Sequence, residues 1–489
     1  MAVSTRTSDE LRALLAEVDP AQELPVCGLQ ELVLGSGCID SVSDTVARLL
    51  EGSTSETTGS RPVVCVLVDS TPIRRLGQDL KELVVRRLGE RYDVRRAVLD
   101  DGAPELHVTE DIVAEAARAC EGADAVVAVG GGTISDIGKL AALGASGDRR
   151  PVLVSVQTAA SVDGYTDDVS VVLRDGVKRT VPSRWPDAVI ADAETIAEAP
   201  ATMNRAGFGE MTSMLVAPAD WRLANLLGVD DTFHHGPIRL LTAVGADIDE
   251  WSAGVRAGDP DGVAGLTRAL AFRGVATGVA GTTAVLSGVE HLVSHMLDQH
   301  HAQHHQPMGL HGAQVGVASV VAASAWEMLL DRMATSSPRL VDEALDADNA
   351  RDRVERAFVG LDPTGRLAQE CWKDYARKLE KVVEARSRIG EVLASWPDHV
   401  SDLGELVRSS RHIAAGLDAA GAAATFDELD PCIGPELARW AVAHCALMRN
   451  RFTVVDLLTI LGWWTDADVD EVFARADAAV ASTRRESPR

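Results

Sequence analysis

Blocks of apolar residues recur through the first two hundred positions of the chain, and segments with helical periodicity separate them. An apolar run between polar residues is typical of a buried parallel strand, and such runs lie at 61–70, 124–132 and 151–161. A further strand is predicted at 92–102. The helices predicted between them are 74–90, 109–123 and 134–145. Thr109 is the expected N-cap of the second helix. This alternation predicts a doubly wound α/β domain with a parallel sheet.

Two other patterns complete the prediction. A short strand, a glycine turn and a helix are expected first, over 29–50. An Asp-Gly pair between β-forming residues predicts a hairpin over 169–183. From about Pro200 onward strand signals disappear, and helical periodicity dominates at 266–286, 315–334 and 374–396.

The change in pattern predicts the domain organisation. A polar leader covers 1–24, an α/β domain 25–200 and an all-α domain 201–480, with the domain boundary near 195–205. The tails, 1–24 and 480–489, are expected to be loosely attached. At 489 residues the chain is long enough for two sizeable cores.

Composition narrows the class of protein. A formal charge of −26 argues against a nucleic acid or an anionic membrane as partner, because both favour clustered Lys and Arg. A small anionic substrate needs only a local basic pocket. The chain lacks an apolar run of about 18 residues, so no membrane insertion is expected. Residues 1–17 do not resemble a signal peptide, and the seven scattered cysteines contain no C-x-x-C pair. We therefore expect a cytoplasmic protein.

The first candidate for chemistry is the glycine turn Gly130, Gly131 and Gly132, followed by Thr133. It stands between a predicted strand and a predicted helix. Glycines let the backbone approach a pyrophosphate closely, and the helix start offers free N–H donors. The turn is not G-x-G-x-x-G, and a bare Gly-Gly-Gly is also a common tight connection. Its place at the carboxyl end of a parallel strand favours ligand binding.

Several motifs together resemble one family. "AVGGGTISDIGKLAA" is similar to the G-G-G-[ST]-x-x-D-x-x-K signature of the superfamily of iron-containing alcohol dehydrogenases, glycerol dehydrogenases and dehydroquinate synthases. "SVQTAASVDG" and "AVIADAETIAEAPATMNRAGFGEMTS" resemble segments of sn-glycerol-1-phosphate dehydrogenases. "ADWRLA", "SGVEHLVSHMLD", "LHGAQVGVAS" and "MRNRFTVVDLL" follow in that family's order, over roughly 28–475.

The resemblance implies a Rossmann-like N-terminal domain that binds NAD or NADP and a helical C-terminal domain that carries a divalent metal. It assigns cofactor contacts to the glycine turn and to Asp136, Thr158, Ser161 and Asp167. Asp69, which ends the strand at 61–70, is in a place where a carboxylate can accept from a ribose hydroxyl. Asp163 resembles the family's substrate-binding Asp.

The metal prediction also has support in the residues themselves. His291 and His295 are four residues apart, hence on one helical face, and His311 stands beside a glycine near the next helix start. Glu210 lies in the glycine-flanked "GFGEM". A carboxylate with two imidazoles and an open fourth position is a usual catalytic metal site, whereas a bare pair of histidines is more often a helix surface. The resemblance implies Glu210, His291 and His311 as ligands and His295 as a substrate contact.

The chain departs from the family in identifiable places. Glu210 stands where these dehydrogenases have Asp, whereas dehydroquinate synthases use a Glu/His/His set. Gln157 replaces a Pro, Val162 replaces a His, and Asp167 replaces a Ser that contacts the cofactor. The last change brings a negative charge to the expected nicotinamide end.

Two further groups of residues have alternative interpretations. His300, His301, His304 and His305 suggest either a second metal site or, as we expect, a solvated loop. Lys178, Arg179 and Arg184 in the predicted hairpin either meet a substrate phosphate or are simply solvated.

The resulting hypothesis is a metal-dependent NAD(P)H oxidoreductase that interconverts dihydroxyacetone phosphate and sn-glycerol 1-phosphate. The metal is expected to be zinc, with nickel and iron as alternatives, and the protein is expected to be a homo-oligomer. Other hypotheses are a dehydrogenase for another small polyol or keto phosphate, a dehydroquinate synthase-like cyclase that uses NAD transiently, and a degenerate binding protein.

Overall fold

The computed structural model describes residues 6–52, 61–103, 105–145, 150–174, 177–245 and 248–486. The chain forms two compact units, and it passes between them more than once. The first unit comprises Met1–Gly207 and Arg239–Gly281, and the second comprises Phe208–Ile238 and Thr282–Arg489.

The first unit is built on a parallel sheet, as the alternating pattern predicted. Its strands in spatial order are β1 (Glu31–Gly35), β10 (Ala188–Asp192), β7 (Val152–Gln157), β6 (Ala125–Gly130), β2 (Val63–Asp69) and β5 (Asp93–Leu99). Strand β10 was missed by the sequence analysis, because its five buried residues are too few to show a pattern. It pairs with both β1 and β7 in the sheet.

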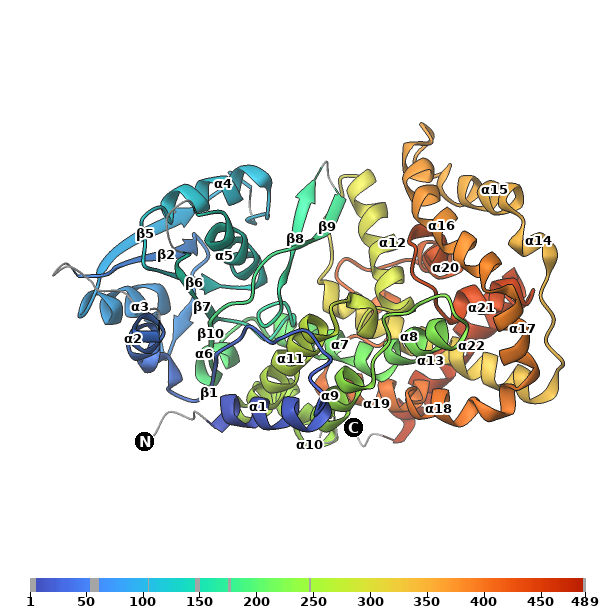
Figure 1. The fold of residues 1–489 in the computed structure, drawn as a ribbon, viewed down its shortest axis with the longest axis horizontal. Helices are drawn as coiled ribbons and strands as arrows, with labels where there is room; N and C mark the ends of the chain where they lie inside the picture. The colour runs from blue at the N-terminus through green and yellow to red at the C-terminus, as the bar shows by residue number, and fades with distance from the viewer. Residues whose placement is uncertain are drawn as a thin grey trace. The chain divides into compact units, whose positions relative to one another are not determined.

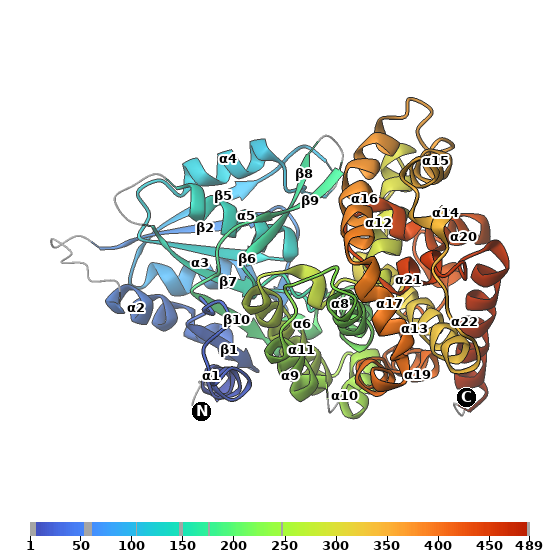
Figure 2. The ribbon, with the colours of Figure 1, turned by 45° about the vertical axis from the view of Figure 1, so that its right-hand side comes forward.

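Helices cover both faces of this sheet. They are α2 (Val42–Gly52), α3 (Leu80–Gly89), α4 (Glu110–Ala119), α5 (Gly132–Gly144) and α6 (Ala193–Ala197). Alternate residues of one strand pack on opposite helices: Val64 and Val66 join the core with α2 and α3, whereas Cys65 and Leu67 join the core with α4 and α5. Figure 1 and Figure 2 show these helix pairs on the two sides of the strands. The predicted doubly wound fold is therefore confirmed.

The predicted helix at 74–90 is wrong for its first six residues. A small hairpin, β3 (Arg74–Arg75) and β4 (Gln78–Asp79), occupies them, with Leu76 and Gly77 at positive φ. Helix α3 begins only after Asp79, whose side chain accepts from the Glu82 N–H at 3.0 Å. The turn and the N-cap therefore prevent the helical periodicity from extending further back.

Both tails are better ordered than predicted. Helix α1 (Arg6–Val18) buries Leu11 and Val18, and Ser8 exchanges hydrogen bonds with the backbone of Leu32. At the other end, helix α22 (Asp466–Glu486) continues past residue 480. Residues 1–5 and 487–489 lie outside the described part of the chain.

The predicted hairpin is confirmed as β8 (Val169–Arg174) paired with β9 (Val177–Pro182). The first unit also gains helices from a later part of the chain, after the predicted domain boundary. These are α10 (Ile248–Ala257), α11 (Pro260–Ala280) and most of α9 (His235–Gly245). Helix α7 (Ala201–Met211) runs from one unit into the other.

The described residues of the second unit form helices and connecting loops, with no strand, and the unit begins with the end of α7. Its helices are α8 (Ala217–Leu226), α12 (Val289–Gln303), α13 (His311–Thr335), α14 (Asp342–Leu345), α15 (Ala347–Phe358), α16 (Arg366–Glu384), α17 (Arg386–Ala394), α18 (Val400–Glu405), α19 (Ser410–Ala420), α20 (Pro435–His444), α21 (Val454–Ile460) and α22. Short 3-10 helices include η2 (Thr212–Leu215), η3 (Thr283–Val285) and η6 (Cys445–Met448).

Helix α13 is the longest apolar helix of this unit. It is long and apolar enough to cross a membrane by length and composition alone, but 83% of that stretch is buried within the fold. Helices α12, α19, α21 and α22 pack against it. It is thus the central core helix of the unit.

Candidate functional site

The glycine turn lies where the sheet reverses its winding. The chain goes from β2 outward to β5 and then returns to β6 on the other side of β2, so β2 and β6 flank the switch point. Ligands of doubly wound sheets bind at the carboxyl ends of the strands at such a point. Gly130 ends β6, Gly131 is the N-cap of α5, and Gly132 begins that helix.

The three glycines have different reasons to lack a side chain. A Cβ on Gly130 would come within 2.7 Å of Ile134, and one on Gly132 within 3.0 Å of Val162. A Cβ on Gly131 would meet nothing within 4 Å. The space beside Gly131 is therefore open. It lies next to the first N–H groups of α5, and Thr133 belongs to that first turn.

Two of the predicted cofactor contacts are held in a buried charge cluster. Lys139, which is 1% exposed, donates to Asp167 at 2.7 Å and lies 3.2 Å from Asp136. Asp136 also accepts from the Val171 N–H at 3.1 Å, which ties α5 to β8. Burial raises the pKa of Asp167 to about 7, although the charge of Lys139 opposes this. Both carboxylates already bond to groups of the first unit. The cofactor roles of Asp136 and Asp167 remain predictions.

Thr158 and Ser161 follow β7 and are buried at 6% and 8% exposure. Helix α7 approaches this segment closely, because a Cβ on Gly207 would lie 1.7 Å from the Ala160 carbonyl oxygen. The Ala160 N–H donates to the Asn204 side chain at 3.0 Å. Contacts with α7 thus hold the segment after β7, and β7 pairs with β6, the strand that the glycine turn follows.

Asp163 has a partner that the sequence analysis missed. Its Oδ2 lies 3.3 Å from Nη2 of Arg273, a fully buried side chain of α11. The turn after Asp163 is fixed to the same helix, because Thr166 donates to the Ala271 carbonyl at 2.6 Å and Gly274 leaves no room for a Cβ beside it. Asp163 is thus held beside a buried guanidinium of α11.

The guanidinium of Arg184 is already bonded to groups of the first unit. It donates to the Pro151 and Trp185 carbonyls and pairs with Asp187 at 2.6 Å. These bonds favour a structural role over binding of a substrate phosphate. Lys178 and Arg179 lie on β9, and the side chain of Lys178 is outside the described part of the structure.

Glu210, His291 and His311 converge in the second unit. Glu210 Oε1 lies 3.3 Å from His291 Nε2, and Glu210 Oε2 lies 3.6 Å from His311 Nε2. Within the described residues they are the one group of at least three His, Cys, Asp or Glu whose potential ligand atoms all lie within 4.8 Å of each other. The sequence placed them 81 and 20 residues apart, and the fold brings their tips together.

Glycines explain how the carboxylate reaches the histidines. Glu210 is on α7 and His311 begins α13, and a Cβ on Gly209 would lie 2.2 Å from the Gly312 carbonyl oxygen. The crossing is also held by Thr212, which donates to Ser319 at 3.0 Å. The two helices therefore touch backbone to backbone, and "GFGEM" is the sequence signal of that contact.

Each histidine is oriented through its other ring nitrogen. His291 Nδ1 lies 2.9 Å from Glu290 Oε1, a fully buried carboxylate. His311 Nδ1 lies 2.9 Å from Ser294 Oγ, which itself donates to Gln314 at 2.6 Å. Since both Nδ1 atoms face acceptors, each neutral imidazole carries its proton there and directs the Nε2 lone pair toward Glu210.

This arrangement requires a positive charge. Burial lowers the pKa of His291, but the charge of Glu210, with smaller contributions from Glu290, raises it to about 9. Lone pairs of imidazole and carboxylate that face each other repel unless a proton or a cation lies between them. One carboxylate oxygen and two imidazole nitrogens are a donor set for a borderline divalent ion such as zinc. The residues therefore fit the metal that the sequence predicted.

His295 lies on the same side of α12 as His291, as its spacing predicted. Its ring centroid is 6.4 Å from that of His291 and 5.7 Å from that of His311, and it stacks on the latter ring at 22°. It is only partly buried. His295 therefore borders the Glu/His/His cluster at a partly exposed position.

The solvated loop that we expected for the histidine-rich segment is confirmed only for its second half, because His304 and His305 are exposed in a turn. Helix α12 continues to Gln303, so His300 and His301 are helical, and His301 is 3% exposed. Burial lowers the pKa of both. His304 caps the helix, and His305 follows at positive φ.

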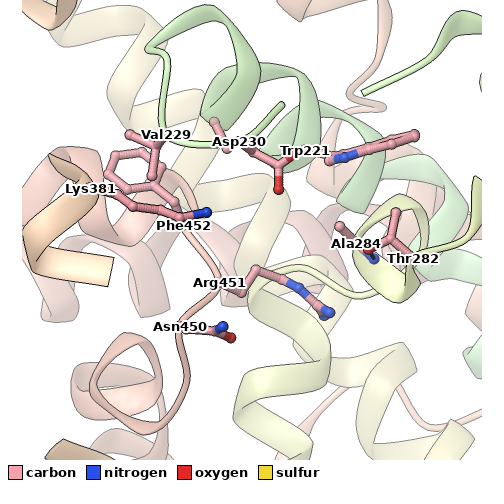
Figure 3. A pocket seen from close by; sticks show the side chains of 10 residues that line it. Trp221, Val229, Asp230, Thr282, Ala284, Lys381, Asn450, Arg451 and Phe452 are labelled. Atoms are coloured by element: carbon pink, nitrogen blue, oxygen red, sulfur yellow. Dashed lines mark hydrogen bonds between the residues drawn. The ribbon is translucent and has the colours of Figure 1, made fainter. Parts of the chain in front are cut away.

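A pocket of about 160 Å³ opens elsewhere in the second unit. Figure 3 shows it with Lys381 and Phe452 on one side and Thr282 and Ala284 on the other. The half-buried Arg451 forms part of its wall and donates to the carbonyl of Ser287, just before α12. The sequence analysis gave none of these residues a role beyond the family motif around Arg451.

Comparison with known proteins decides the family. The iron-containing alcohol dehydrogenase family profile matches residues 42–200. The glycerol-1-phosphate dehydrogenase of Natronomonas pharaonis is 31% identical over 359 residues, which is 68% of this chain and 93% of the relative. That of Bacillus subtilis is 25% identical over 430 residues, or 87% of this chain and 90% of the relative. The chain belongs to the glycerol-1-phosphate dehydrogenase family.

Membership in the glycerol-1-phosphate dehydrogenase family makes this protein an enzyme and confirms the resemblance that its motifs indicated. At the level of the family its chemistry is NAD(P)-dependent oxidoreduction of an alcohol. Solved structures agree on the fold. Glycerol dehydrogenase from Schizosaccharomyces pombe matches with a TM-score of 0.57 at 13% identity, covering 94% of this chain and 93% of that one. Maleylacetate reductase from Agrobacterium tumefaciens matches with a TM-score of 0.53 at 16% identity, covering 93% and 98%.

Asp69 allows a prediction on the cofactor of this glycerol-1-phosphate dehydrogenase family member. Its Oδ1 pairs with Lys81 Nζ at 2.6 Å, and its Oδ2 accepts from Thr71 at 2.8 Å, so the carboxylate stays at the end of β2. We expect NADH to be used at least as well as NADPH, because this carboxylate repels a 2′-phosphate while Lys81 weakens the repulsion. Steady-state kcat/KM with each cofactor checks this, and a hundredfold preference for NADPH would contradict it.

Proposed function

We propose that the enzyme is a metal-dependent NAD(P)H oxidoreductase that interconverts dihydroxyacetone phosphate and sn-glycerol 1-phosphate. The observation that carries the proposal is the convergence of Glu210, His291 and His311 in a chain of this family. Both histidines direct Nε2 toward the same carboxylate, which suits a divalent cation with an open position for substrate. Zinc is our first candidate for the metal, before nickel and iron.

When bound, the divalent cation polarises the ketone oxygen and the reduced nicotinamide supplies the hydride. Glu210, His291 and His311 would hold the cation. The N–H groups after Gly131 would hold the pyrophosphate of the cofactor, and Thr158 and Ser161 would contact it. Asp163, which pairs with Arg273, would accept a hydrogen bond from a substrate hydroxyl. His295 would donate or relay a proton to the new alcohol.

A sugar-phosphate cyclase of the dehydroquinate synthase type is the second candidate. One observation favours it: the carboxylate of the cluster is Glu210, one methylene longer than the Asp usual in these dehydrogenases. A cyclase regenerates its cofactor within each turnover, whereas a dehydrogenase consumes it. Net cofactor oxidation therefore separates the two candidates.

The proposed reaction gives a direct prediction. Zinc-loaded enzyme with dihydroxyacetone phosphate and NADH should oxidise one equivalent of NADH per molecule of product, followed by absorbance at 340 nm. In the reverse direction it should oxidise sn-glycerol 1-phosphate and leave its mirror image, sn-glycerol 3-phosphate, untouched, because a chiral site presents only one arrangement of hydroxyl and hydride acceptor.

Two outcomes would overturn this proposal. Product formation without net NADH oxidation would favour the cyclase. Faster turnover of another polyol or keto phosphate would change the substrate but keep the dehydrogenase. A cytoplasmic location and a homo-oligomeric assembly remain predictions from the sequence.

A further inference from the structure

Glu290 is the residue next to the proposed metal ligand His291 and faces its Nδ1, but the charge of this carboxylate has no role assigned so far. Its side chain is fully buried in the first turn of α12. Oε1 accepts from the Gly288 N–H at 2.7 Å and lies 2.9 Å from His291 Nδ1. The buried Oε2 has no hydrogen-bond partner among the described residues. A buried carboxylate is costly unless a nearby positive charge compensates it, so this residue calls for an explanation.

The other histidine of the cluster is oriented differently. His311 Nδ1 meets the hydroxyl of Ser294, which donates to Gln314, so its partners are neutral. The site therefore has one imidazole with a charged partner and one with an uncharged partner. Hydrogen bonds to a carboxylate raise the basicity of the ligating nitrogen more than those to a hydroxyl.

We propose that Glu290 is a positioning residue of the metal centre, which fixes the Nδ1–H tautomer of His291 and adds a second negative charge, besides that of Glu210, that attracts a divalent cation. This inference rests on the proposed function, since it needs a metal at Glu210, His291 and His311. By the same reasoning Ser294 fixes the tautomer of His311, but it adds no charge.

The surroundings of Glu290 support a functional rather than a purely structural charge. The neighbouring carboxyl of Asp220 accepts from Trp326 and from the N–H groups of Val289 and Val454, so it holds chain segments together. Arg451 donates to the Ser287 carbonyl and the Thr283 hydroxyl, which hold the segment before α12. Burial lowers the pKa of Arg451 and the charge of Glu290 opposes this, so Arg451 is a charged neighbour of Glu290, with no hydrogen bond described between them. Glu290, in contrast, meets only the N–H of Gly288 and the ring of His291 among the hydrogen bonds described for it.

Asp220 provides a matched control. Burial, with the charge of Glu290, raises the pKa of Asp220 to about 8. Asp220→Asn changes a buried carboxyl near Glu290 whose described hydrogen bonds go to Val289, Trp326 and Val454 and to none of Glu210, His291 and His311. Glu290→Gln keeps the size and an acceptor oxygen for His291 Nδ1 but removes the charge.

The test is a zinc titration of metal-depleted full-length enzyme, with a chromophoric chelator as competitor. Glu290→Gln should raise the zinc Kd by about ten- to a hundredfold, the range found for outer partners of metal ligands. Ser294→Ala should raise it less, and Asp220→Asn should leave it unchanged. The absorption spectrum of the cobalt-substituted protein should shift in Glu290→Gln and not in Asp220→Asn. The Tm of metal-free Glu290→Gln should not fall, because the substitution removes a buried charge.

The outcomes are distinguishable. Wild-type enzyme that binds no stoichiometric zinc would overturn the proposed function. Tight zinc binding by the wild type with an unchanged Kd in Glu290→Gln would overturn the inference alone. An equal loss in Asp220→Asn, or a lower Tm of metal-free Glu290→Gln with unchanged zinc affinity, would also overturn it, because Glu290 would then be merely structural.

Discussion

Replacing His291 by alanine is expected to remove most of the bound metal and to lower turnover by about a thousandfold. The side chain supplies one of the proposed protein ligands, and its Nε2 lies 3.3 Å from Glu210. A Lewis-acidic cation contributes several kcal/mol to a carbonyl reduction, and each 1.4 kcal/mol corresponds to about a factor of ten in rate. Metal content by mass spectrometry and ketone-dependent NADH oxidation measure the two effects.

The same substitution also leaves Glu210 and Glu290 without the imidazole that separates them, which threatens the fold. His311→Ala is the companion variant, since its side chain is 27% exposed and its hydroxyl partner Ser294 is neutral. We expect it to fold and to lose metal as well. Full metal content with unchanged ketone reduction in either folded variant would show that the cluster is not the metal site.

Glu210→Asp extends this series. The shorter side chain would place the carboxylate farther from His291 Nε2 and His311 Nε2, which now lie 3.3 and 3.6 Å from the oxygens of Glu210. Because Gly209 is pressed against Gly312, α7 cannot move closer to compensate. Metal affinity and ketone reduction should therefore fall together. An Asp variant that keeps its metal but changes its reaction would instead support the cyclase-like interpretation of Glu210.

Gly131→Val is expected to weaken NADH binding by about ten- to a hundredfold while the fold survives. A Cβ there meets nothing within 4 Å in the protein, and a backbone φ of −74° and ψ of −171° suits valine. The space it fills is where the pyrophosphate would approach the N–H groups of α5. Hydrogen bonds to a charged group contribute about 1.5–3 kcal/mol each, which converts to that loss of affinity.

Gly434→Val is the matched control for this substitution. Gly434 is also an N-cap glycine with an extended backbone, φ −68° and ψ 158°, and it likewise has open space beside it. It precedes α20 in the second unit and follows no strand. Both variants should keep the wild-type Tm, and only Gly131→Val should lose NADH fluorescence enhancement. If Gly131→Val binds NADH as tightly as the wild type, the turn is not the pyrophosphate site.

Local signals in the sequence were sufficient for several elements, although they misplaced the start of α3 and missed β10. Thr109 caps α4 by accepting from the Ile112 N–H, the two strands of the predicted hairpin pair, and the apolar runs become strands. The helical spacing of His291 and His295 also survives in α12. These features depend on periodicity and on hydrogen bonds within a few residues, which the sequence contains directly.

The sequence alone also determined which residue types the chemistry would need: a glycine turn after a strand, and a carboxylate and two histidines for a metal. Only the tertiary structure decided what surrounds them. Arg273 reaches Asp163 across 110 positions, and Lys139 engages Asp167 across 28. Residues 239–281 join the first unit although their pattern is indistinguishable from that of the later helices. Such partners are selected by the packing of distant segments and by the cost of burying an uncompensated charge, and neither leaves a periodic trace in the chain.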